Sequence, residues 1–399
     1  MSTSGIRLVM LQYAGDYGDA FERFAAGGDE TYYAQRYSVD FVGDLRQKID
    51  DLTVICNRTP APYNKVLAND VRAIGAGSSG SINAGELAAL VAAQNPTHVT
   101  IGFPDRKLFA WAIQSQFKTL GLLADSFNHT KLKEKFKGFL LARQLNHPLV
   151  NWVGNHGENS ARSLQAIGVN PNKIIPWDWP HSMRPDDFTP KSQPDSTQPF
   201  KLVYVGSVIA AKGVGDILDA LSQLRSQGLV ARLKVAGRGD LEAFKAQATS
   251  LGIVDQVEFL GLVPHKQVVH LMREADAVVV PSRHEYPEGF PMTLYEAMCS
   301  RTPIIASDHP MFLGKLHHQT NAIIFPAGQP TALARAIKTL QTDASLYQAL
   351  SQASAEAWQR LQIPVKWGEL IERWLFDSPE NRQWLYNRRL KSSWYGKTK

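Results

Sequence analysis

The sequence predicts an α/β protein with two domains, each a parallel sheet covered by helices on both faces. Three observations support this prediction. The chain has 399 residues, which is more than one hydrophobic core normally serves. Short β-branched segments alternate with helical patterns in both halves, an order typical of parallel sheets. A proline-rich stretch separates the halves.

The composition is that of a folded chain. Hydrophobic residues make up 44% and charged residues 20%, which excludes wholesale disorder. No segment approaches the ~18 apolar residues of a membrane span, and the first residues lack the pattern of a secretory signal. The two cysteines, Cys56 and Cys299, are too few for a disulfide framework. We therefore expect a cytoplasmic enzyme.

The net charge of +6 comes mostly from the C-terminal end. Residues 378–399 contain six basic residues and one acidic residue, so no basic face is spread over the chain and we expect no nucleic-acid partner. The same segment contains Trp384, Tyr386, Trp394 and Tyr395. Two interpretations stay open: peripheral contact with an anionic membrane, or a frayed, solvated C-terminus.

The proline-rich stretch sets the predicted domain boundaries. Residues 1–180 form the N-terminal domain, 181–199 the linker and 200–362 the C-terminal domain. Residues 363–399 are expected to be a helical segment that returns to the N-terminal domain, followed by the basic aromatic tail.

The elements follow from apolar runs of strand length and from helical periodicity. In the first half we expect strands at 6–11, 52–55, 98–101 and 149–153, with helices at 84–94 and 106–118. In the second half we expect strands at 201–205, 232–236, 257–260, 277–280 and 303–306. Helices are expected at 213–227, 240–251, 266–274, 292–299, 331–342, 344–361 and 364–376.

The most informative stretch is residues 277–299. A strand ends at Pro281, a polar loop follows, and a helix begins near Pro291. The N–H groups at the start of that helix would make a phosphate site in the cleft between the domains. Glu288 precedes the helix and Glu296 lies inside it. The alternative is a surface loop and helix with two solvated glutamates.

Other strand ends in the second half show similar features. Gly206 is followed by Lys212 at a helix start, and Gly237 by Arg238. Gly261 and Val263 follow a third strand, where backbone groups would meet a nucleobase. Each is an ordinary βα turn by itself, but together they indicate a site for a phosphorylated ligand.

Residues 201–326 resemble the donor-binding domain of retaining glycosyltransferases of family 4 (glycosyl transferases group 1). The resemblance rests on Gly206…Lys212-Gly213, Ala236-Gly237, Pro281-Ser282, Glu288-Gly289-Phe290-Pro291…Glu296 and Pro303–Ser307. It implies the GT-B fold: two Rossmann-like, doubly wound parallel-sheet domains facing a central cleft. It also implies a nucleotide sugar as co-substrate, no other cofactor and no metal, and no Asp-x-Asp motif occurs in the sequence.

The resemblance also implies roles for individual residues. Glu288 would lie beside the transferred sugar, Glu296 would bind the ribose and Lys212 a phosphate. The backbone near the sugar hydroxyls and diphosphate would belong to Gly289, Phe290, Pro291 and Met292. In the first half, Gly27 and Gly28 resemble a loop near the diphosphate and acceptor, and His156 ends an inter-domain strand.

The sequence departs from the family pattern at several positions. Ser207 stands where an arginine is usual, so the remaining phosphate charge would fall on Arg238 or Arg283. Residues 307–312 replace a glycine pair, and Arg301 replaces a helix-ending glycine.

Asp125 and His129 follow an apolar strand of the first half, where a general base or sugar-binding residue would lie. The alternative for them, and for His156, is a structural or surface role. Nearby, residues 128–146 form an amphipathic helical pattern. Its apolar stripe is Leu132, Phe136, Phe139 and Leu140, and its basic residues are Lys131, Lys133, Lys135, Lys137 and Arg143.

For this helix we favour docking of the stripe on its own domain, with solvated lysines. The alternative is contact with anionic lipid or with an anionic, lipid-diphosphate acceptor.

The sequence as a whole predicts a retaining glycosyltransferase. It would transfer a hexose from a UDP- or GDP-sugar to a saccharide or lipid-linked acceptor in cell-surface polysaccharide or glycolipid synthesis. The alternatives are a GT-B-like sugar-nucleotide epimerase and a non-catalytic subunit that binds a nucleotide sugar. The first would change the sugar without any acceptor, and the second would bind without turnover.

Overall fold

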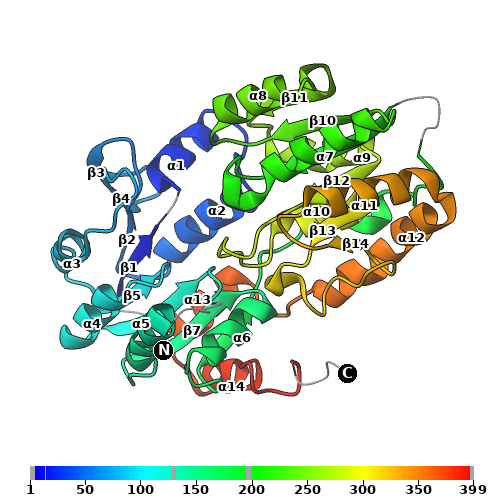
Figure 1. Cartoon of the computed structure of the whole chain (residues 1–399). Helices are drawn as coiled ribbons and strands as arrows, with labels where there is room; N and C mark the ends of the chain where they lie inside the picture. The colour runs from blue at the N-terminus through cyan, green and yellow to red at the C-terminus, as the bar shows by residue number, and fades with distance from the viewer. Residues whose placement is uncertain (1–4, 14, 128–131, 195–198, 396–399) are drawn as a thin grey trace. The chain divides into compact units, whose positions relative to one another are not determined.

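The computed structural model describes residues 5–13, 15–127, 132–194 and 199–395. The chain divides into two compact units (Figure 1). Unit 1 contains residues 1–30, 34–180 and 363–399, and unit 2 contains residues 31–33 and 181–362. The chain therefore leaves unit 1 briefly at residues 31–33 and again for residues 181–362, and it returns to unit 1 at residue 363.

Unit 1 is built on an eight-stranded sheet in the order β3-β4-β2-β1-β5-β6-β7-β8. The strands are β1 Arg7–Gln12, β2 Asp51–Cys56, β3 Pro62–Val66, β4 Arg72–Ala76, β5 His98–Ile101, β6 Lys118–Leu123, β7 Val150–His156 and β8 Ile174–Trp177. All neighbours pair parallel except β3, which pairs antiparallel with β4. This edge strand was not predicted, because its alternating exposure gives it no continuous apolar run.

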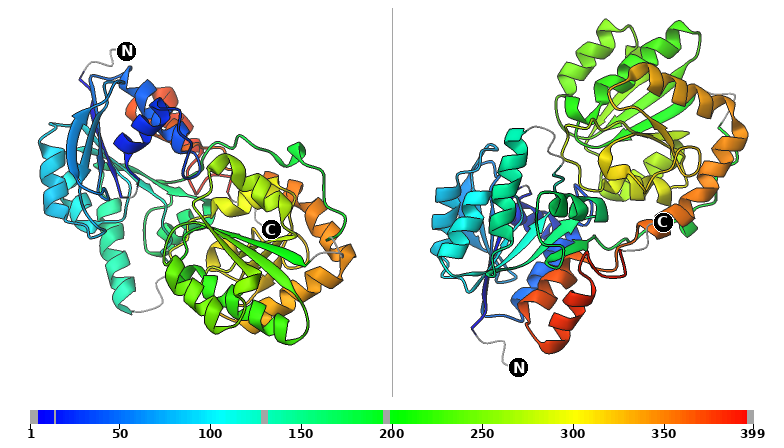
Figure 2. Two further views of the ribbon diagram at one scale, coloured as in Figure 1. Left: turned by 90° about the horizontal axis from the view of Figure 1, so that it is seen from above. Right: turned by 60° about the horizontal axis from the view of Figure 1, so that its bottom comes forward.

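Helices cover both faces of this sheet. One core involves α3 Ala84–Ala92, α4 Arg106–Gln114, α5 Leu132–Leu145 and α6 Glu158–Ala166. The other involves α1 Tyr17–Ala25, α2 Gln35–Arg46, α13 Trp367–Leu375 and α14 Pro379–Asn387. Figure 2 shows α13 beside α2, so the end of the chain completes the layer that its beginning starts.

Unit 2 has a six-stranded, all-parallel sheet in the order β11-β10-β9-β12-β13-β14. The strands are β9 Phe200–Val205, β10 Ala231–Ala236, β11 Val257–Gly261, β12 Ala277–Val280, β13 Ile304–Ser307 and β14 Ile323–Phe325. Central strand β12 is buried along its whole length, as its Ala-Val-Val-Val sequence requires. The prediction of two doubly wound α/β domains is confirmed.

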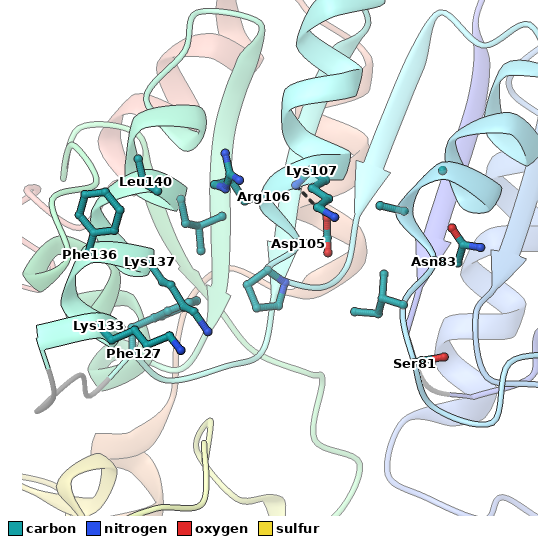
Figure 3. A pocket seen from close by; sticks show the side chains of 16 residues that line it. Ser81, Asn83, Asp105, Arg106, Lys107, Phe127, Lys133, Phe136, Lys137 and Leu140 are labelled. Carbon is teal, nitrogen blue, oxygen red and sulfur yellow. Dashed lines mark hydrogen bonds between the residues drawn. The ribbon is translucent and has the colours of Figure 1, made fainter.

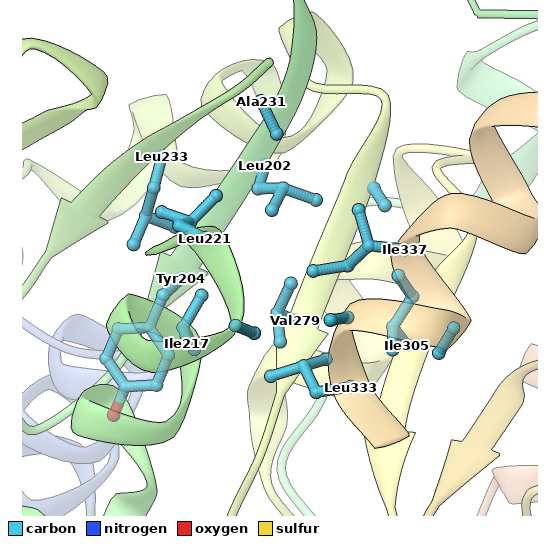
Figure 4. Close-up of a cluster of buried hydrophobic side chains, with 14 of the residues drawn as sticks. Leu202, Tyr204, Ile217, Leu221, Ala231, Leu233, Val279, Ile305, Leu333 and Ile337 are labelled. Atoms are coloured by element: carbon cyan, nitrogen blue, oxygen red, sulfur yellow. The ribbon is translucent and has the colours of Figure 1, made fainter. Parts of the chain in front are cut away.

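The helices of unit 2 form two layers. The layer shown in Figure 4 packs α7 Val214–Ser226 and α11 Pro330–Thr342 on the sheet through Ile217, Leu221, Leu333 and Ile337. α8 Leu241–Ser250 adjoins it. The opposite layer contains α9 His265–Glu274, α10 Met292–Cys299 and α12 Ala344–Leu361. None of the described helices in either unit combines the length and apolar composition that a membrane-spanning segment requires.

The proline-rich stretch 181–199 is packed against unit 2 along its described part. Arg301 Nε donates to the Pro185 carbonyl at 2.9 Å, and the Lys191 backbone donates to Ser351 Oγ at 2.8 Å. The Lys191 ammonium also donates to the Arg273 carbonyl at 2.7 Å. These contacts hold the described part of the segment, including the short 3-10 turn Pro185–Asp187, on the surface of unit 2.

The C-terminal segment is anchored on unit 1. Trp374 Nε1 donates to Asn151 Oδ1 at 3.0 Å, and the Leu390 backbone donates to the Ile174 carbonyl at 2.8 Å. Leu390 and Tyr395 are both buried. The interpretation of this end as frayed is therefore wrong for the described residues up to 395.

Helix α5 turns a different face to its domain than the sequence suggested. Its buried residues are Gly138, Leu141, Ala142 and Leu145. Leu132, Phe136 and Phe139 of the predicted docking stripe are exposed by 84%, 62% and 58%. The favoured interpretation, docking through this stripe, is wrong. The helix is apolar on two opposite sides, and the periodicity alone did not say which side packs.

Candidate functional site

The loops at the carboxyl ends of the unit 2 strands are held together by backbone contacts that need glycine. A Cβ on Gly213 would lie 2.2 Å from the Pro281 carbonyl oxygen, and one on Gly237 would lie 1.8 Å from the Gly206 oxygen. Both glycines have positive φ, 74° and 148°. The loops after β9, β10 and β12 therefore meet at one edge of the sheet.

The centre of this edge is a buried ion pair between Lys212 and Glu288. Glu288 is 5% exposed, and its carboxylate accepts from the Lys212 ammonium and from Ser282 Oγ, the latter at 2.6 Å. The ammonium also lies 4.4 Å from the centre of the Tyr286 ring. Lys212 comes from the turn after β9 and Glu288 from the loop after β12, so the fold brings together residues 76 positions apart.

Two helices begin at this edge without a side-chain cap. Pro291 precedes α10 and Gly213 precedes α7, and neither has a side chain that can accept from the first N–H groups. The uncapped N–H groups and the positive end of the helix dipole favour an anion. Lys212 immediately precedes Gly213, so a cation and a helix start occupy the same turn.

Glu296 is the fifth residue of α10, about one turn from the start of the helix, and is also buried, with 6% exposure. Its Oε1 lies 2.9 Å from Nε2 of His265, the first residue of α9. The two glutamates thus belong to separate polar contacts. Neither is a solvated surface glutamate, which excludes the alternative interpretation of this stretch.

The two arginines proposed as phosphate ligands differ in their surroundings. The Arg283 guanidinium makes a bidentate pair with buried Asp216 of α7, at 3.0 and 2.6 Å. This pair raises the pKa of Arg283 and fixes the loop after β12 on α7. Arg238 is exposed in the turn after β10. Ser207 is exposed too, and its carbonyl accepts from Tyr204 Oη at 2.7 Å.

His309 supports the loop that contains Glu288. Its Nδ1 accepts from the Met311 backbone at 3.2 Å, so Nε2 carries the proton and donates to the Tyr286 carbonyl at 3.0 Å. Burial lowers the pKa of His309, which favours this neutral form. The Glu288 N–H bonds the same carbonyl at 2.8 Å. Residues 307–312, which replace a glycine pair of the family pattern, therefore support the loop that contains Glu288.

The remaining predicted donor residues have mixed roles. Phe290 is buried in the core, with its ring 5.3 Å from that of Tyr295, so only its backbone is available to a ligand. Pro291 and Met292 form the start of α10, next to Gly289. The Gly261 carbonyl accepts from the Gly237 N–H at 2.7 Å, which places Val263 just beyond a second backbone contact.

The glycine pair of unit 1 has a structural function. Gly27 has φ 79° just after α1, and the Gly28 N–H donates to the Arg23 carbonyl at 2.8 Å. These contacts terminate the helix, as glycine commonly does in the left-handed conformation. His156 is buried, and its Nε2 lies 3.2 Å from Asp178 Oδ1.

Asp125 lies just after β6 and is partly buried. Burial raises the pKa of its carboxyl group to about 6. The Asn155 side chain donates to the Asp125 backbone carbonyl at 2.9 Å, which fixes this loop against β7. A carboxyl group with such a pKa suits proton transfer near neutral pH. The other candidate base, His129, lies outside the described residues.

The region that contains this site is similar to a known protein family. Residues 186–357 match the glycosyl transferases group 1 family model. We refer to residues 186–357 as the group 1 domain, after the family that they resemble. The match covers Lys212, Glu288 and Glu296, and the whole of the edge described above.

Curated relatives match over part of the chain. The chain is 35% identical over 154 residues to phosphatidyl-myo-inositol mannosyltransferase of Mycobacterium leprae, covering 39% of this chain and 40% of that protein. It is 27% identical over 195 residues to the amylovoran biosynthesis glycosyltransferase AmsK of Erwinia amylovora, covering 48% of each. The chain thus spans less than half the length of these relatives.

Solved structures match over both units. HepE of Anabaena, in complex with UDP, superposes with a TM-score of 0.60 at 16% identity, covering 90% of this chain and 96% of that one. Sucrose-phosphate synthase of Thermosynechococcus elongatus gives 0.65 at 17% identity, covering 96% and 99%. At these identities the likeness shows the fold, and the chain has the GT-B fold.

Several residues around the group 1 site were missed as site residues from the sequence. Ser282 and His265 bond the two glutamates, Tyr286 packs on Lys212, and Asp216 pairs with Arg283. Ser282 lies two residues after the end of the central strand β12, and such a position is a signal for a site residue. The others lie on elements whose approach no spacing in the sequence reveals.

The Lys212–Glu288 pair is expected to contribute strongly to the stability of unit 2. Lys212→Met or Glu288→Gln each leaves one buried group without its partner, at a cost of about 3 kcal/mol. The double variant should be destabilised by clearly less than the sum. Urea unfolding followed by circular dichroism measures this coupling.

The exposed Lys245–Glu242 pair on α8, at 2.8 Å, supplies the control. Lys245→Met and Glu242→Gln should each change stability by less than about 0.5 kcal/mol. Additive effects of Lys212→Met and Glu288→Gln would contradict the structural importance of the buried pair.

Asp125 gives a pH-dependent prediction. Its pKa is raised from 3.8 to about 6 in the folded chain, so the folded state binds the proton more tightly. The free energy of unfolding should therefore fall as pH rises from about 4 to about 6. Asp125→Asn should stabilise the protein at pH ~7 by up to about 3 kcal/mol and have no effect near pH ~3.5. Equal unfolding midpoints of both proteins across this range would contradict the shift.

Proposed function

We propose that the protein is a retaining glycosyltransferase that transfers a hexose from a UDP- or GDP-sugar to a saccharide or lipid-linked acceptor. The observation that carries the proposal is the buried Lys212–Glu288 pair beside the uncapped starts of α7 and α10. A cation, a carboxylate and free N–H groups at one sheet edge are what a sugar diphosphate requires.

The relatives support the same chemistry. One is named as a phosphatidyl-myo-inositol mannosyltransferase and another as an amylovoran biosynthesis glycosyltransferase. The structure of HepE in complex with UDP-glucose superposes on this chain with a TM-score of 0.61 at 16% identity. We therefore place the proposed reaction in polysaccharide or glycolipid synthesis.

In the proposed reaction the chain's own groups stabilise the leaving diphosphate. Lys212 and the first N–H groups of α10 would bind the phosphates and take up the charge that develops as the glycosidic bond breaks. Glu288 would hold sugar hydroxyls, and Glu296 the ribose. The acceptor hydroxyl would attack on the face that the diphosphate leaves, with a diphosphate oxygen taking its proton, so that the anomeric configuration is retained.

We propose that this charge compensation needs no divalent cation and no further cofactor. Lys212 directly precedes Gly213 and the uncapped start of α7, so a cation and a helix start occupy the same turn. The Arg283 guanidinium is held by Asp216 and would contribute through the loop that it fixes. Addition of EDTA to the purified protein should accordingly leave turnover unchanged.

Nucleotide-sugar turnover tests the site. With UDP-glucose, UDP-galactose or GDP-mannose, the protein should release nucleoside diphosphate, slowly by hydrolysis and faster with an acceptor. Lys212→Ala and Glu288→Gln should each reduce the rate by at least ~100-fold, because each removes a group that stabilises the transition state. Folding at the assay temperature is checked by circular dichroism.

Lys245→Ala and Glu242→Gln serve as controls, since they remove the same charges from an exposed pair in the same unit. Normal rates in both site variants would contradict the assignment of the site. A new nucleotide sugar formed without acceptor would identify an epimerase instead. The anomeric configuration of the first product, followed by NMR, decides between retention and inversion.

Nucleotide binding is tested separately from turnover. The matching nucleoside diphosphate at ~100 times its dissociation constant should stabilise the protein by about 2.7 kcal/mol, which a thermal-shift assay detects. Glu296→Gln should reduce the shift for ribonucleotides without affecting the response to pyrophosphate. Strong shifts without any turnover would identify a non-catalytic binding subunit.

A further inference from the structure

Helix α5 of unit 1 has an outer face that its own domain leaves uncovered. We define this outer face by Leu132, Phe136 and Phe139, which lie at i, i+4 and i+7 and therefore on one side of the helix. They are exposed by 84%, 62% and 58%. The inner side is already anchored by Leu141, Ala142 and Leu145. The outer face is thus not needed to hold the helix in place.

Exposing two phenylalanines and a leucine together is unfavourable in water. Most other exposed large apolar side chains in the described ranges are scattered over separate elements, such as Val254, Leu313 and Trp394. On α5 three of them form one continuous line of about 10 Å along the axis. Such a line is typical of a surface that a partner covers.

The outer face is flanked by basic side chains. Lys133, Lys135, Lys137 and Arg143 are all exposed on α5, where Glu134 is the one acidic residue between Leu132 and Leu145. Lysines on both sides of an apolar line let the apolar side chains enter a lipid layer while the ammonium groups stay with the headgroups.

A pocket of about 990 Å³ adjoins the helix. Lys133 and Lys137 line it from α5, and Arg106 and Lys107 line it from the start of α4 (Figure 3). Asp105 also lines it, but this carboxylate caps α4 by accepting from the Lys107 and Leu108 N–H groups at 2.8 and 2.9 Å. The four cations therefore outnumber the single carboxylate, and the pocket suits phosphate groups.

We propose that the outer face of α5 docks the protein on a bilayer that contains anionic phospholipid. Leu132, Phe136 and Phe139 enter the boundary between headgroups and acyl chains, while Lys133, Lys137 and the α4 cations bind phosphates. Charge complementarity and the arrangement of the three exposed apolar side chains in one line favour a membrane over a folded protein partner. This surface lies in unit 1 and is independent of the proposed donor site in unit 2.

Vesicle flotation of the full chain, with no nucleotide sugar present, tests the proposal. The protein should float with phosphatidylcholine vesicles containing ~30% phosphatidylglycerol and bind pure phosphatidylcholine at least ~10-fold more weakly. Binding should fall as salt rises from ~0.05 to ~0.5 M, because the shorter Debye length screens the lysines. Equal binding to both vesicle types, or to neither, overturns the proposal.

Two paired variants separate the apolar and the electrostatic contributions. Phe136→Ser with Phe139→Ser should weaken binding by at least ~10-fold, and Lys133→Glu with Lys137→Glu by ~30-fold or more. The matched controls are Val254→Ser with Leu313→Ser, and Lys245→Glu with Lys338→Glu, all exposed residues of unit 2. Loss of binding in the controls to the same degree would overturn the assignment to α5.

A fluorescent label detects insertion directly. Cys56 and Cys299 are both buried, so Leu132→Cys can be labelled selectively with an environment-sensitive dye. Anionic vesicles should shift its emission to the blue and leave a label at Leu313→Cys unchanged.

Two further outcomes would overturn the proposal in favour of another occupant. Competition by millimolar pyrophosphate, with no dependence on vesicle charge, would assign the pocket to one phosphorylated ligand. A sedimenting dimer that Phe136→Ser with Phe139→Ser dissociates would make the face an interface between two copies. The vesicle, labelling and sedimentation experiments measure membrane docking even if the protein turns over no nucleotide sugar.

Discussion

The buried ion pair between Lys212 and Glu288 is the interaction on which the proposed site depends. A carboxylate that is 5% exposed is costly unless it is paired, and the Lys212 ammonium and the Ser282 hydroxyl provide its partners. The pair forms only if the turns after β9 and β12 touch. Gly213 makes that approach possible, since any side chain there would collide with the Pro281 carbonyl.

The same edge of the sheet combines charge with backbone donors. α7 and α10 start without side-chain caps, whereas Asn83 and Asp105 cap α3 and α4 of unit 1. In the group 1 domain, no polar side chain therefore caps the first N–H groups of α7 or α10. Arg283 and His309 stabilise the surrounding loops through Asp216 and the Tyr286 carbonyl.

The helices on the two faces of the unit 1 sheet have different roles. Its C-terminal helices α13 and α14 complete one layer, which ties the end of the chain to its beginning. On the other layer, α5 packs through one side and leaves Leu132, Phe136 and Phe139 to solvent. Gly27 and Gly28 end α1, so the resemblance to a ligand loop is accompanied by a local structural role.

The sequence by itself determined the α/β class and most strands and helices of unit 2, and it singled out Glu288, Glu296 and Lys212 as candidate site residues. Continuous apolar runs such as 277–280 are local signals because a buried strand needs apolar side chains. Glycines at strand ends are local signals because tight turns need their backbone freedom. Only the tertiary structure decided which partners each charge finds, which side of α5 packs, and that β3 joins the edge antiparallel. These outcomes depend on contacts between distant segments, such as Arg283 with Asp216 or Glu296 with His265, and no local pattern encodes them.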